Sequence, residues 1–452
     1  MNEARAHWRR LQSEVADSAA WTQDLIDRQA TAGLTYQGKP AMLVAEPQLL
    51  TEAELAEDQA VATAVVAALV AAGRRLLAEP ALQDRYTPGW LDGVPDADLF
   101  AIPAGYPEPV VFGRLDGVRT PDGLRVLEFN GGLPGGILPA DGSAALLAGT
   151  DLAQQFALEY PFRTATAGED VIDAMVKTWH DFGGSGLPYT VVAMPTELTA
   201  IAAPAIGYLT SLATPRGIEI EVADPGDLVF SDGRLRRDGR AVDVMVRAFF
   251  TPMLSYLGER LDGIKAALRA QSLCMITSLQ SGLFGLKSLF AMVTDPTVDL
   301  DVAADQVSLA REHLPWTRLV AAGPSTDAGG STIDLLDHVR ANRDQLVVKP
   351  TEGYGGAGVE LGWTHTEQSW REVVDRAAAG GHVVQQRVPI VTEHYTVLAE
   401  GFPVRGFNGD HNPLLCAGKV AGYYVRLAPE GSGITNVTGG GASVAPTFIL
   451  QS

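Results

Sequence analysis

The first 85 residues carry apolar side chains at helical spacing, in a stretch rich in Ala, Leu, Glu and Arg. The most apolar run, Val61 to Ala72, has acidic residues before it and Arg74 and Arg75 after it. Because this run is too short to span a bilayer, it predicts a buried helix. We therefore expect an N-terminal helical region over residues 1–105.

From about residue 109 the pattern changes to short β-like runs separated by turns. An apolar run from Val110 leads to a turn expected at Asp116 and Gly117, and Thr120 to Gly123 then precedes the alternating run Leu124 to Phe129. Turn residues between two such runs are typical of a β-hairpin. We expect its second strand to end at Asn130, within a domain spanning residues 106–185.

Strands then alternate with helical sequence. Tyr189 to Met194 and Ile218 to Val222 are β-like and flank a helical stretch, and Arg234 to Arg236 and Val242 to Val246 follow. Strand–helix–strand units favour a parallel sheet. We expect a small, Rossmann-like α/β substrate domain over residues 186–275.

We expect a further region over residues 276–452, in which strands and helices mix from about Leu314. Helical sequence runs from about Pro252 to Ala291, and a glycine-rich tail spans Gly431 to Ala442. With 452 residues, 46% of them hydrophobic, the chain can bury the core of two or three domains. The pattern predicts a mixed α/β or α+β fold.

Charge and cysteine content limit the classes of function. The formal net charge of −20 argues against general affinity for nucleic acid or an anionic membrane, which reward a basic face. Cys274 and Cys416 are too few for a disulfide framework and indicate a reducing cytoplasm. Both lie in apolar surroundings and are expected to be core residues. The start, Met1 to Arg5, lacks the apolar segment of a secretion signal.

The segment Leu346 to Val359 is the most informative. An apolar strand leads to Lys349, and a loop with four glycines follows directly. Backbone N–H groups of such a loop can approach phosphate oxygens, and the lysine would neutralise their charge. The spacing matches neither a Walker loop nor a Rossmann GxGxxG, and a plain glycine-rich hairpin would show the same pattern.

Two further segments carry polar residues beside glycines. Glu128 and Asn130 share one face of a strand end, and their oxygens suit Mg²⁺. Arg426 closes an apolar strand, and Asn436 precedes a triple glycine. Arginine there would suit a carboxylate or a phosphoryl group. Each segment also fits an ordinary strand that runs into a flexible turn.

Together the three segments resemble the ATP-grasp superfamily, in which a strand lysine, a glycine-rich loop and a Glu-x-Asn metal pair surround ATP. In most members the metal pair follows the lysine, whereas here Glu128 and Asn130 precede Lys349. This order resembles the circularly permuted branch, which includes eukaryotic-type glutathione synthetases and related bacterial ligases. The resemblance covers about residues 106–450 and implies that fold.

The resemblance implies roles for individual residues. The expected nucleotide-binding residues are Lys287, Lys349, Glu352, Gly353, Tyr354, Gly355, Gly356, Gln385, Gln386 and Val388, the last three on the strand that contacts adenine. The expected metal ligands are Glu128, Asn130 and Glu352. The expected catalytic residues are Arg114, Arg247 and Arg426, and the expected substrate-binding residues are Arg114, Asp116, Arg247, Asn436 and Gly440.

The chain departs from glutathione synthetase itself in three places. Glu352 lies nearer to Lys349 than the corresponding metal glutamate lies to its lysine. A glutamate near the adenine ribose is replaced around Ala417, and the tail after Asn436 lacks an obvious basic residue. These departures favour a related ligase with another pair of substrates.

The implied function is ATP- and Mg²⁺-dependent formation of an amide, of peptide or γ-glutamyl type, between amino acids or small peptides. The carboxylate would be activated as an acyl phosphate. Two alternatives remain open: a carboxylate kinase that stops at phosphorylation, and an inert nucleotide-binding protein on the same fold. We expect no nucleic-acid or membrane partner, and a homodimer with the N-terminal helices as its candidate interface.

Overall fold

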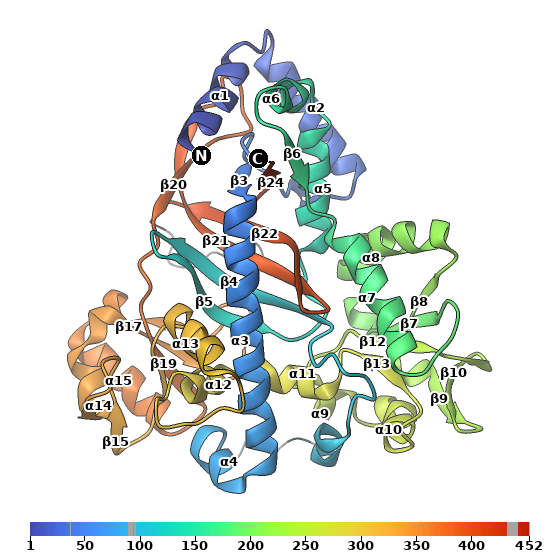
Figure 1. The fold of residues 1–452 in the computed structure, drawn as a ribbon, viewed down its shortest axis with the longest axis vertical. Helices are drawn as coiled ribbons and strands as arrows, with labels where there is room; N and C mark the ends of the chain where they lie inside the picture. The colour runs from blue at the N-terminus through green and yellow to red at the C-terminus, as the bar shows by residue number, and fades with distance from the viewer. Residues whose placement is uncertain (37, 89–93, 95, 354, 432–441, 452) are drawn as a thin grey trace.

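The structure, a computed structural model, describes residues 1–451 apart from 37, 89–93, 95, 354 and 432–441. At its centre is a six-stranded antiparallel sheet in the order β23-β22-β21-β4-β5, with β20 also paired to β21 (Figure 1). The strands are β4 (Phe112–Thr120), β5 (Gly123–Asn130), β20 (Thr392–Thr396), β21 (Val404–Cys416), β22 (Lys419–Pro429) and β23 (Ser443–Ala445). The predicted hairpin is confirmed as β4 and β5, and its second strand ends at Asn130. The turn expected at Asp116 and Gly117 is wrong, because β4 continues through both residues with only a shift of register between them.

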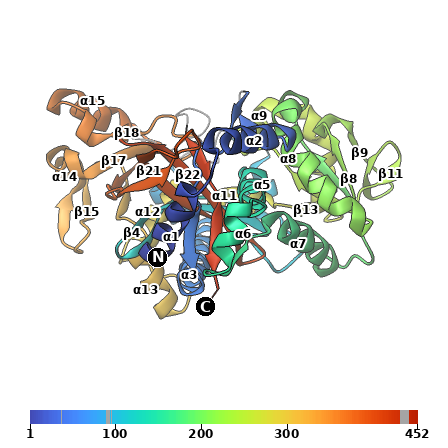
Figure 2. The same ribbon diagram turned by 90° about the horizontal axis from the view of Figure 1, so that it is seen from above.

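The longest helix, α3 (Glu52–Ala78), crosses one face of this sheet (Figures 1 and 2). It begins at a capping box in which Thr51 and Glu54 each accept a hydrogen bond from the other's backbone N–H. The helix extends well beyond the run Val61 to Ala72, and its 27 residues are long and apolar enough to cross a membrane by length and composition. The buried-helix prediction nevertheless holds, because Val65 and Leu69 are fully buried in a core shared with the sheet.

We had expected the N-terminal region to be helical, but its described residues also contain three strands. Its elements are α1 (Asn2–Ser13), α2 (Ser18–Thr31), β1 (Thr35–Tyr36), β2 (Lys39–Pro40), β3 (Gln48–Thr51), α3 and α4 (Pro80–Tyr86). Strand β3 pairs in parallel with β24 (Thr447–Leu450), which also pairs with β6 (Phe162–Thr164). The pattern did not reveal β3 because its partner strand lies far along the sequence.

A parallel sheet in the order β13-β12-β7-β8 lies to one side of the central sheet (Figure 1), so the parallel sheet expected for this segment is present. Its standing as a separate Rossmann-like substrate domain stays a prediction. Its elements are β7 (Tyr189–Ala193), α8 (Thr196–Ala213), β8 (Glu219–Ala223), β12 (Val244–Arg247) and β13 (Cys274–Ile276). The uninterrupted helical stretch expected from Pro252 to Ala291 is wrong, because the buried strand β13 divides it. The helices of that stretch are α9 (Met253–Leu257), α10 (Asp262–Arg269), α11 (Leu279–Phe284) and α12 (Lys287–Val293).

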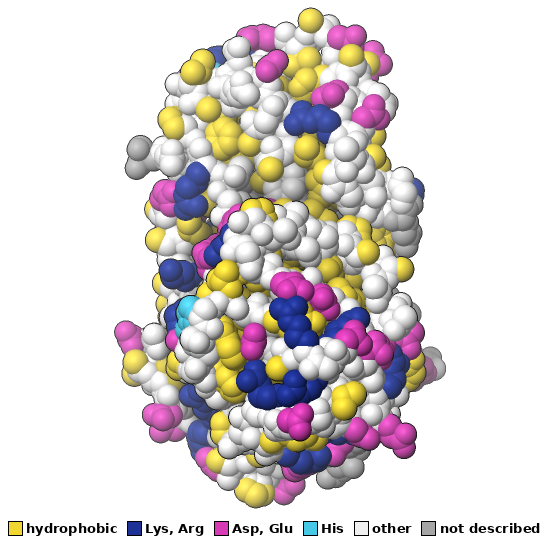
Figure 3. Space-filling model, turned by 90° about the vertical axis from the view of Figure 1, so that its right-hand side faces the viewer, with side chains coloured by type: hydrophobic (Ala, Val, Ile, Leu, Met, Phe, Trp, Pro, Cys, Tyr) yellow, Lys and Arg dark blue, Asp and Glu magenta, His cyan; other side chains and the backbone are white. Residues whose placement is uncertain are grey.

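Helices and a short antiparallel ribbon complete this side of the molecule. The helices are α5 (Ile137–Ala148), α6 (Asp151–Ala157) and α7 (Ala167–Asp181), and the ribbon strands are β9 (Leu228–Ser231), β10 (Arg234–Arg237) and β11 (Arg240–Ala241). Figure 3 views the molecule from this side and shows Lys and Arg interspersed with Asp and Glu. The ribbon arginines are paired with acidic residues, as Arg234–Asp243, Arg236–Asp232, Arg237–Glu221 and Arg240–Glu219. This face therefore has no unopposed run of positive charge among the described ribbon residues.

The segment with the predicted glycine-rich loop forms another sheet, in the order β14-β19-β17-β18, on the opposite side of the central sheet (Figure 1). Its strands are β14 (Thr317–Leu319), β17 (Leu346–Pro350), β18 (Glu360–Leu361) and β19 (His382–Gln386). Around it lie α13 (Ala304–His313), β15 (Pro324–Thr326), β16 (Thr332–Asp334), α14 (Leu335–Ala341) and α15 (Glu367–Ala378). Trp370 and Val384 are buried in the core that joins this sheet to its helices.

Candidate active site

Alternate residues of β4 and β5 place four polar side chains on one face of the central sheet. Arg114 is the cross-strand partner of Asn130, and Asp116 is the partner of Glu128. Side chains at such positions are close neighbours, and Asn130 Nδ2 donates to Asp116 Oδ1 at 3.2 Å. The prediction that Glu128 and Asn130 share a face is confirmed.

Asp116 joins two of the predicted catalytic arginines. Arg114 donates to both of its carboxylate oxygens, at 2.5 and 2.9 Å, and Arg426 on β22 donates to Oδ2 at 2.9 Å. Burial raises the pKa of Asp116, but the two guanidinium groups outweigh burial and hold it below its ordinary value. Asp116 is therefore ionised at neutral pH and bridges two cations.

Arg247, the third predicted arginine, ends β12 and is bound to backbone carbonyls. It donates to the carbonyl oxygens of Phe249, Thr277 and Ser278 at 2.6, 3.0 and 3.1 Å. Its side chain is buried, and these bonds tie the end of β12 to the backbone of residues 277–278. The structure thus shows Arg247 holding a loop together, and its role toward a substrate stays a prediction.

Two lysines approach Glu128 from other parts of the fold. The Nζ atom of Lys287, at the start of α12, lies 3.2 Å from Glu128 Oε2 and donates to the Gly353 carbonyl at 3.1 Å. Lys349 on β17 donates to Gln385 Oε1 at 2.7 Å. Lys287 therefore connects the strand of the Glu-x-Asn pair with the start of the glycine-rich loop.

The environment of Lys349 brings the pKa of its amine close to the neutral range. Burial lowers the pKa of its amine from the ordinary value to about 8. Lys287 lowers this pKa as well, whereas Glu128 and Asp116 raise it and offset part of the effect. A phosphate bound beside Lys349 would favour the charged amine, so the site is suited to a polyanionic ligand.

The glycine-rich loop adopts backbone conformations that suit glycine. Gly355, Gly356 and Gly358 have φ angles of 66°, 78° and 71°, in the left-handed region. Glu352 and Gly353 are half-buried at the start of the loop. Backbone N–H groups of such a loop can surround phosphate oxygens. Three residues assigned to the site from the sequence lie outside the described residues: Tyr354, Asn436 and Gly440.

The predicted adenine strand presents its residues on two faces. Gln385 is buried and faces Lys349, whereas Gln386 is exposed. Gln386 and Val388 line a cavity of about 670 Å³ that also contacts Trp316. Successive strand residues point in opposite directions, so Gln385 alone of these three lies against the lysine, and adenine binding by this strand stays a prediction.

The donor atoms at the sheet face suit one kind of metal. Glu128 and Asn130 offer a carboxylate and an amide oxygen two residues apart on β5. Within the described part of the chain, no group of three or more His, Cys, Asp or Glu residues could hold a metal. Mg²⁺ commonly takes one or two protein oxygens and completes its shell with phosphate and water. The residues present therefore fit Mg²⁺ that arrives with a nucleotide.

Three residues of this face, Asp410, Asn412 and Tyr424, were not expected from the sequence. Asp410 receives hydrogen bonds from Arg426, and Asn412 lies beside Asp410. The Tyr424 ring centre lies 5.7 Å from the guanidinium carbon of Arg114 and 5.6 Å from that of Arg426. The available signal was the alternation of Asp410 and Asn412 directly before an apolar run.

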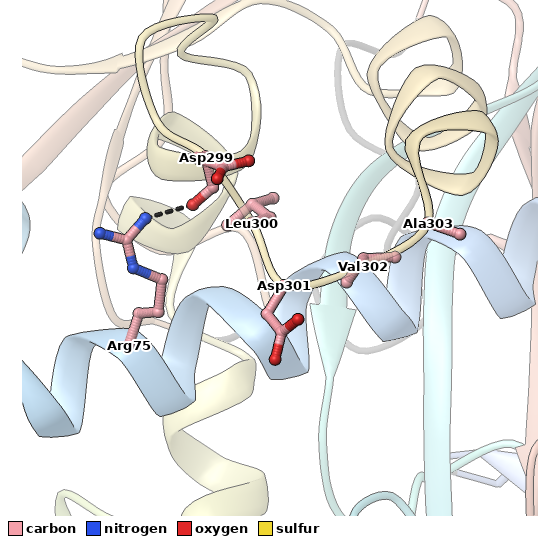
Figure 4. Close-up of a pocket in the computed structure, with 6 residues that line it drawn as sticks. All are labelled: Arg75, Asp299, Leu300, Asp301, Val302 and Ala303. Carbon is pink, nitrogen blue, oxygen red and sulfur yellow. Dashed lines mark hydrogen bonds between the residues drawn. The ribbon is translucent and has the colours of Figure 1, made fainter.

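A separate cavity, of about 630 Å³, lies beside α3 (Figure 4). It is lined by Arg75 and by residues 299–303, and Arg75 donates to the carbonyl of Asp299. Its lining includes none of the described residues assigned to the candidate site. We therefore place the chemistry at the sheet face and not in this cavity.

Comparison with known proteins shows a fold but no sequence family. No family model and no curated protein matches the chain. Among solved structures, it is similar to a glutathione synthetase-like effector, GSS30, from Globodera pallida in its apo form. That similarity has a TM-score of 0.59 and 12% identity, and it covers 95% of this chain and 96% of that one.

The chain thus has a mixed α/β fold like that of a glutathione synthetase-like protein. Circular permutation stays a prediction. The ATP-grasp ligase PsnB, solved with a minimal precursor, Mg and ADP, matches over 59% of this chain and 90% of its own at 14% identity. Its TM-score of 0.27 is too low to support an argument.

Proposed function

We propose that this protein is an ATP-dependent ligase that joins the carboxylate of one amino-acid-like substrate to the amine of another. The position of Lys287 carries the proposal, because its amine lies 3.2 Å from Glu128 and 3.1 Å from the Gly353 carbonyl. One cation thereby joins the expected metal pair to the expected phosphate loop. Arg426 reaches the same sheet face through Asp116, which provides a cationic group next to the phosphate end.

At the phosphate end, Lys287 and Lys349 hold phosphate oxygens of ATP, and the backbone of the glycine-rich loop covers the γ-phosphate. Glu128 and Asn130, with Glu352 as a further ligand, would hold Mg²⁺, which supplies charge neutralisation. Phosphoryl transfer needs mainly positioning and cations. This chain supplies both with two lysines, Lys287 buried and Lys349 half-buried, and a loop that excludes water when nucleotide is bound.

At the substrate end, a carboxylate oxygen attacks the γ-phosphorus of ATP, the bond to the bridging oxygen breaks, and ADP leaves. The product is an acyl phosphate. The amine of the second substrate attacks the acyl carbon, phosphate leaves, and the nitrogen loses a proton to give the amide. Arg426 stabilises the negative charge that develops on the acyl oxygen, and Arg114 anchors the substrate carboxylate.

The test is ADP release from the full chain with ATP, Mg²⁺ and pairs of amino acids or short peptides, followed by mass spectrometry of the products. We expect release that depends on both substrates, and a product that has lost water relative to the pair. A phosphorylated substrate without an amide would identify a carboxylate kinase instead. ATP binding without substrate-dependent ADP release across the panel would refute ligase activity.

Two variants test the site residues, and a third variant serves as a matched control. Lys349→Ala and Glu128→Ala should each abolish ADP release while the thermal unfolding curve stays cooperative. Lys177→Ala should keep wild-type activity, because Lys177 is exposed on α7 and pairs only with Asp181 among the described residues. Full turnover in either site variant would refute the assignment of the site.

A further inference from the structure

Asp410 and Asn412 lie on β21 on either side of His411. Both are buried, and because alternate strand residues share a face, both point toward the face that carries Arg426. His411 points to the other face, where its Nε2 atom lies 2.7 Å from Glu393. The two polar residues therefore belong to the candidate site and not to the core beneath it.

Asp410 holds one edge of the Arg426 guanidinium group. Nε of Arg426 lies 3.0 and 2.9 Å from the two carboxylate oxygens, and Nη2 donates to Oδ2 at 2.5 Å. Asp116 accepts a second bond from Nη2 at 2.9 Å. Among the described residues, the hydrogen bonds of the Arg426 guanidinium group use Nε and Nη2, so Nη1 is the nitrogen that neither aspartate engages.

Asn412 connects this carboxylate to the next strand. Its Nδ2 donates to Asp410 Oδ1 at 2.8 Å and to the Tyr424 carbonyl at 2.8 Å, and its Oδ1 accepts from the Gly117 N–H at 3.1 Å. The register of β4 shifts between Asp116 and Gly117. Such bulges redirect side chains next to functional sites. One amide thus fixes Asp410 relative to the bulge that directs Asp116.

We propose that Asp410 is a positioning residue: together with Asn412 it holds Arg426 so that Nη1 faces the anionic group of the substrate. For what Arg426 does, the proposal rests on the ligase function above. The cluster contains two arginines and two aspartates, and this balance lets charged groups stay buried before a ligand arrives. An arginine held at two points loses little conformational freedom when it binds an anion.

A purely electrostatic role and a positioning role of Asp410 predict opposite changes in anion binding by Arg426, which makes the proposal testable. As a mere negative neighbour, Asp410 would weaken the attraction of Arg426 for an anion, so its neutralisation would strengthen binding. As a positioning residue, its loss would free a long side chain that must then be ordered again on binding. That cost corresponds to about tenfold in affinity.

The experiment follows the Nε–H resonance of Arg426 in the full chain labelled with ¹⁵N-arginine, with Arg426→Lys for assignment and inorganic phosphate as the probe. We compare wild type with Asp410→Asn, which removes the charge, and Asp410→Glu, which keeps the charge and moves the carboxylate. Asp122→Asn is the control, because Asp122 is exposed on the β4–β5 turn. Thermal unfolding identifies any variant that does not fold, and the other Asp410 variant then decides.

We expect phosphate to shift the Arg426 resonance in wild type and in Asp122→Asn. Both Asp410 variants should bind phosphate about tenfold more weakly and exchange the Nε–H about tenfold faster. Tighter binding in Asp410→Asn, unchanged binding in Asp410→Glu, or no response of Arg426 to phosphate in wild type would each overturn the proposal. If Arg426 responds as expected but no substrate pair releases ADP, the ligase proposal fails and the positioning role stands.

Discussion

The lowered pKa of Lys349 predicts that nucleotide affinity varies with pH where ordinary lysines do not titrate. Burial lowers this pKa to about 8. Because the charged amine is the form that binds phosphate, affinity should follow the protonated fraction, which falls from about 0.9 at pH 7 to about 0.1 at pH 9. ADP should therefore bind about tenfold more weakly at pH 9. A lysine with the ordinary pKa would stay more than about 95% charged.

The assay is calorimetric titration with ADP, without added metal, from pH 7 to 9, where the terminal phosphate of ADP is already ionised. Lys349→Arg keeps its charge throughout this range and should show a flat profile. Glu128→Gln removes the carboxylate that raises the pKa of Lys349, so the midpoint should move below 8. Lys177→Arg, at the exposed control position, should keep the wild-type profile.

Two outcomes would refute this reasoning. Wild-type affinity that is constant from pH 7 to 9 would show that Lys349 does not titrate there or does not contact phosphate. A midpoint that Glu128→Gln moves upward would show that Glu128 does not stabilise the charged amine. If Lys349→Arg binds no ADP, the pH dependence of the wild type and the shift of its midpoint in Glu128→Gln together test whether Lys349 titrates in this range.

Two further predictions concern stability. Burial raises the pKa of Glu393. His411, 2.7 Å away, together with Tyr395 and Arg5, outweighs burial and lowers this pKa to about 2. The ionised Glu393 therefore contributes stability that is complete above the ordinary pKa of about 4.3 and is lost as pH falls through about 2. In urea unfolding, Glu393→Gln should lose less free energy of unfolding between pH 5 and 3 than wild type does. Gly131→Ala would place a methyl group 2.0 Å from the Ser281 carbonyl oxygen and should lower the melting temperature by several degrees, whereas Gly135→Ala, with nothing within 4 Å, should not. A Gly131→Ala melting curve equal to wild type, or Glu393→Gln following the wild-type acid profile, would contradict them.

Elements with a strong local pattern could be predicted from the sequence. The β4–β5 hairpin follows from its turn residues, and the parallel sheet follows from strands that alternate with helices. β3 and β13 could not be predicted, because short strands depend on partners that are distant in sequence. Pairing between distant strands leaves no local periodicity.

The candidate site divides in the same way. Glu128, Lys287 and Lys349 could be found because each lies next to glycines or a strand end with a known counterpart, and the structure brings them together. Asp410 and Asn412 could not, because their role depends on the register of β21 against β22 and β4. The residues around Asp410 and Asn412 do not indicate with which distant strands β21 pairs.

The order of strands in the central sheet also bears on how the chain folds. β4 pairs with β21, so Arg114 lies opposite Leu414 in the finished sheet. Bringing two such distant segments together costs loop-closure entropy before the strand pairing contributes any stability. Until β21 arrives, the β4–β5 hairpin exposes an unpaired edge. Slow refolding, with a transient species that associates through this edge, is the expected consequence of placing the site on strands from distant parts of the chain.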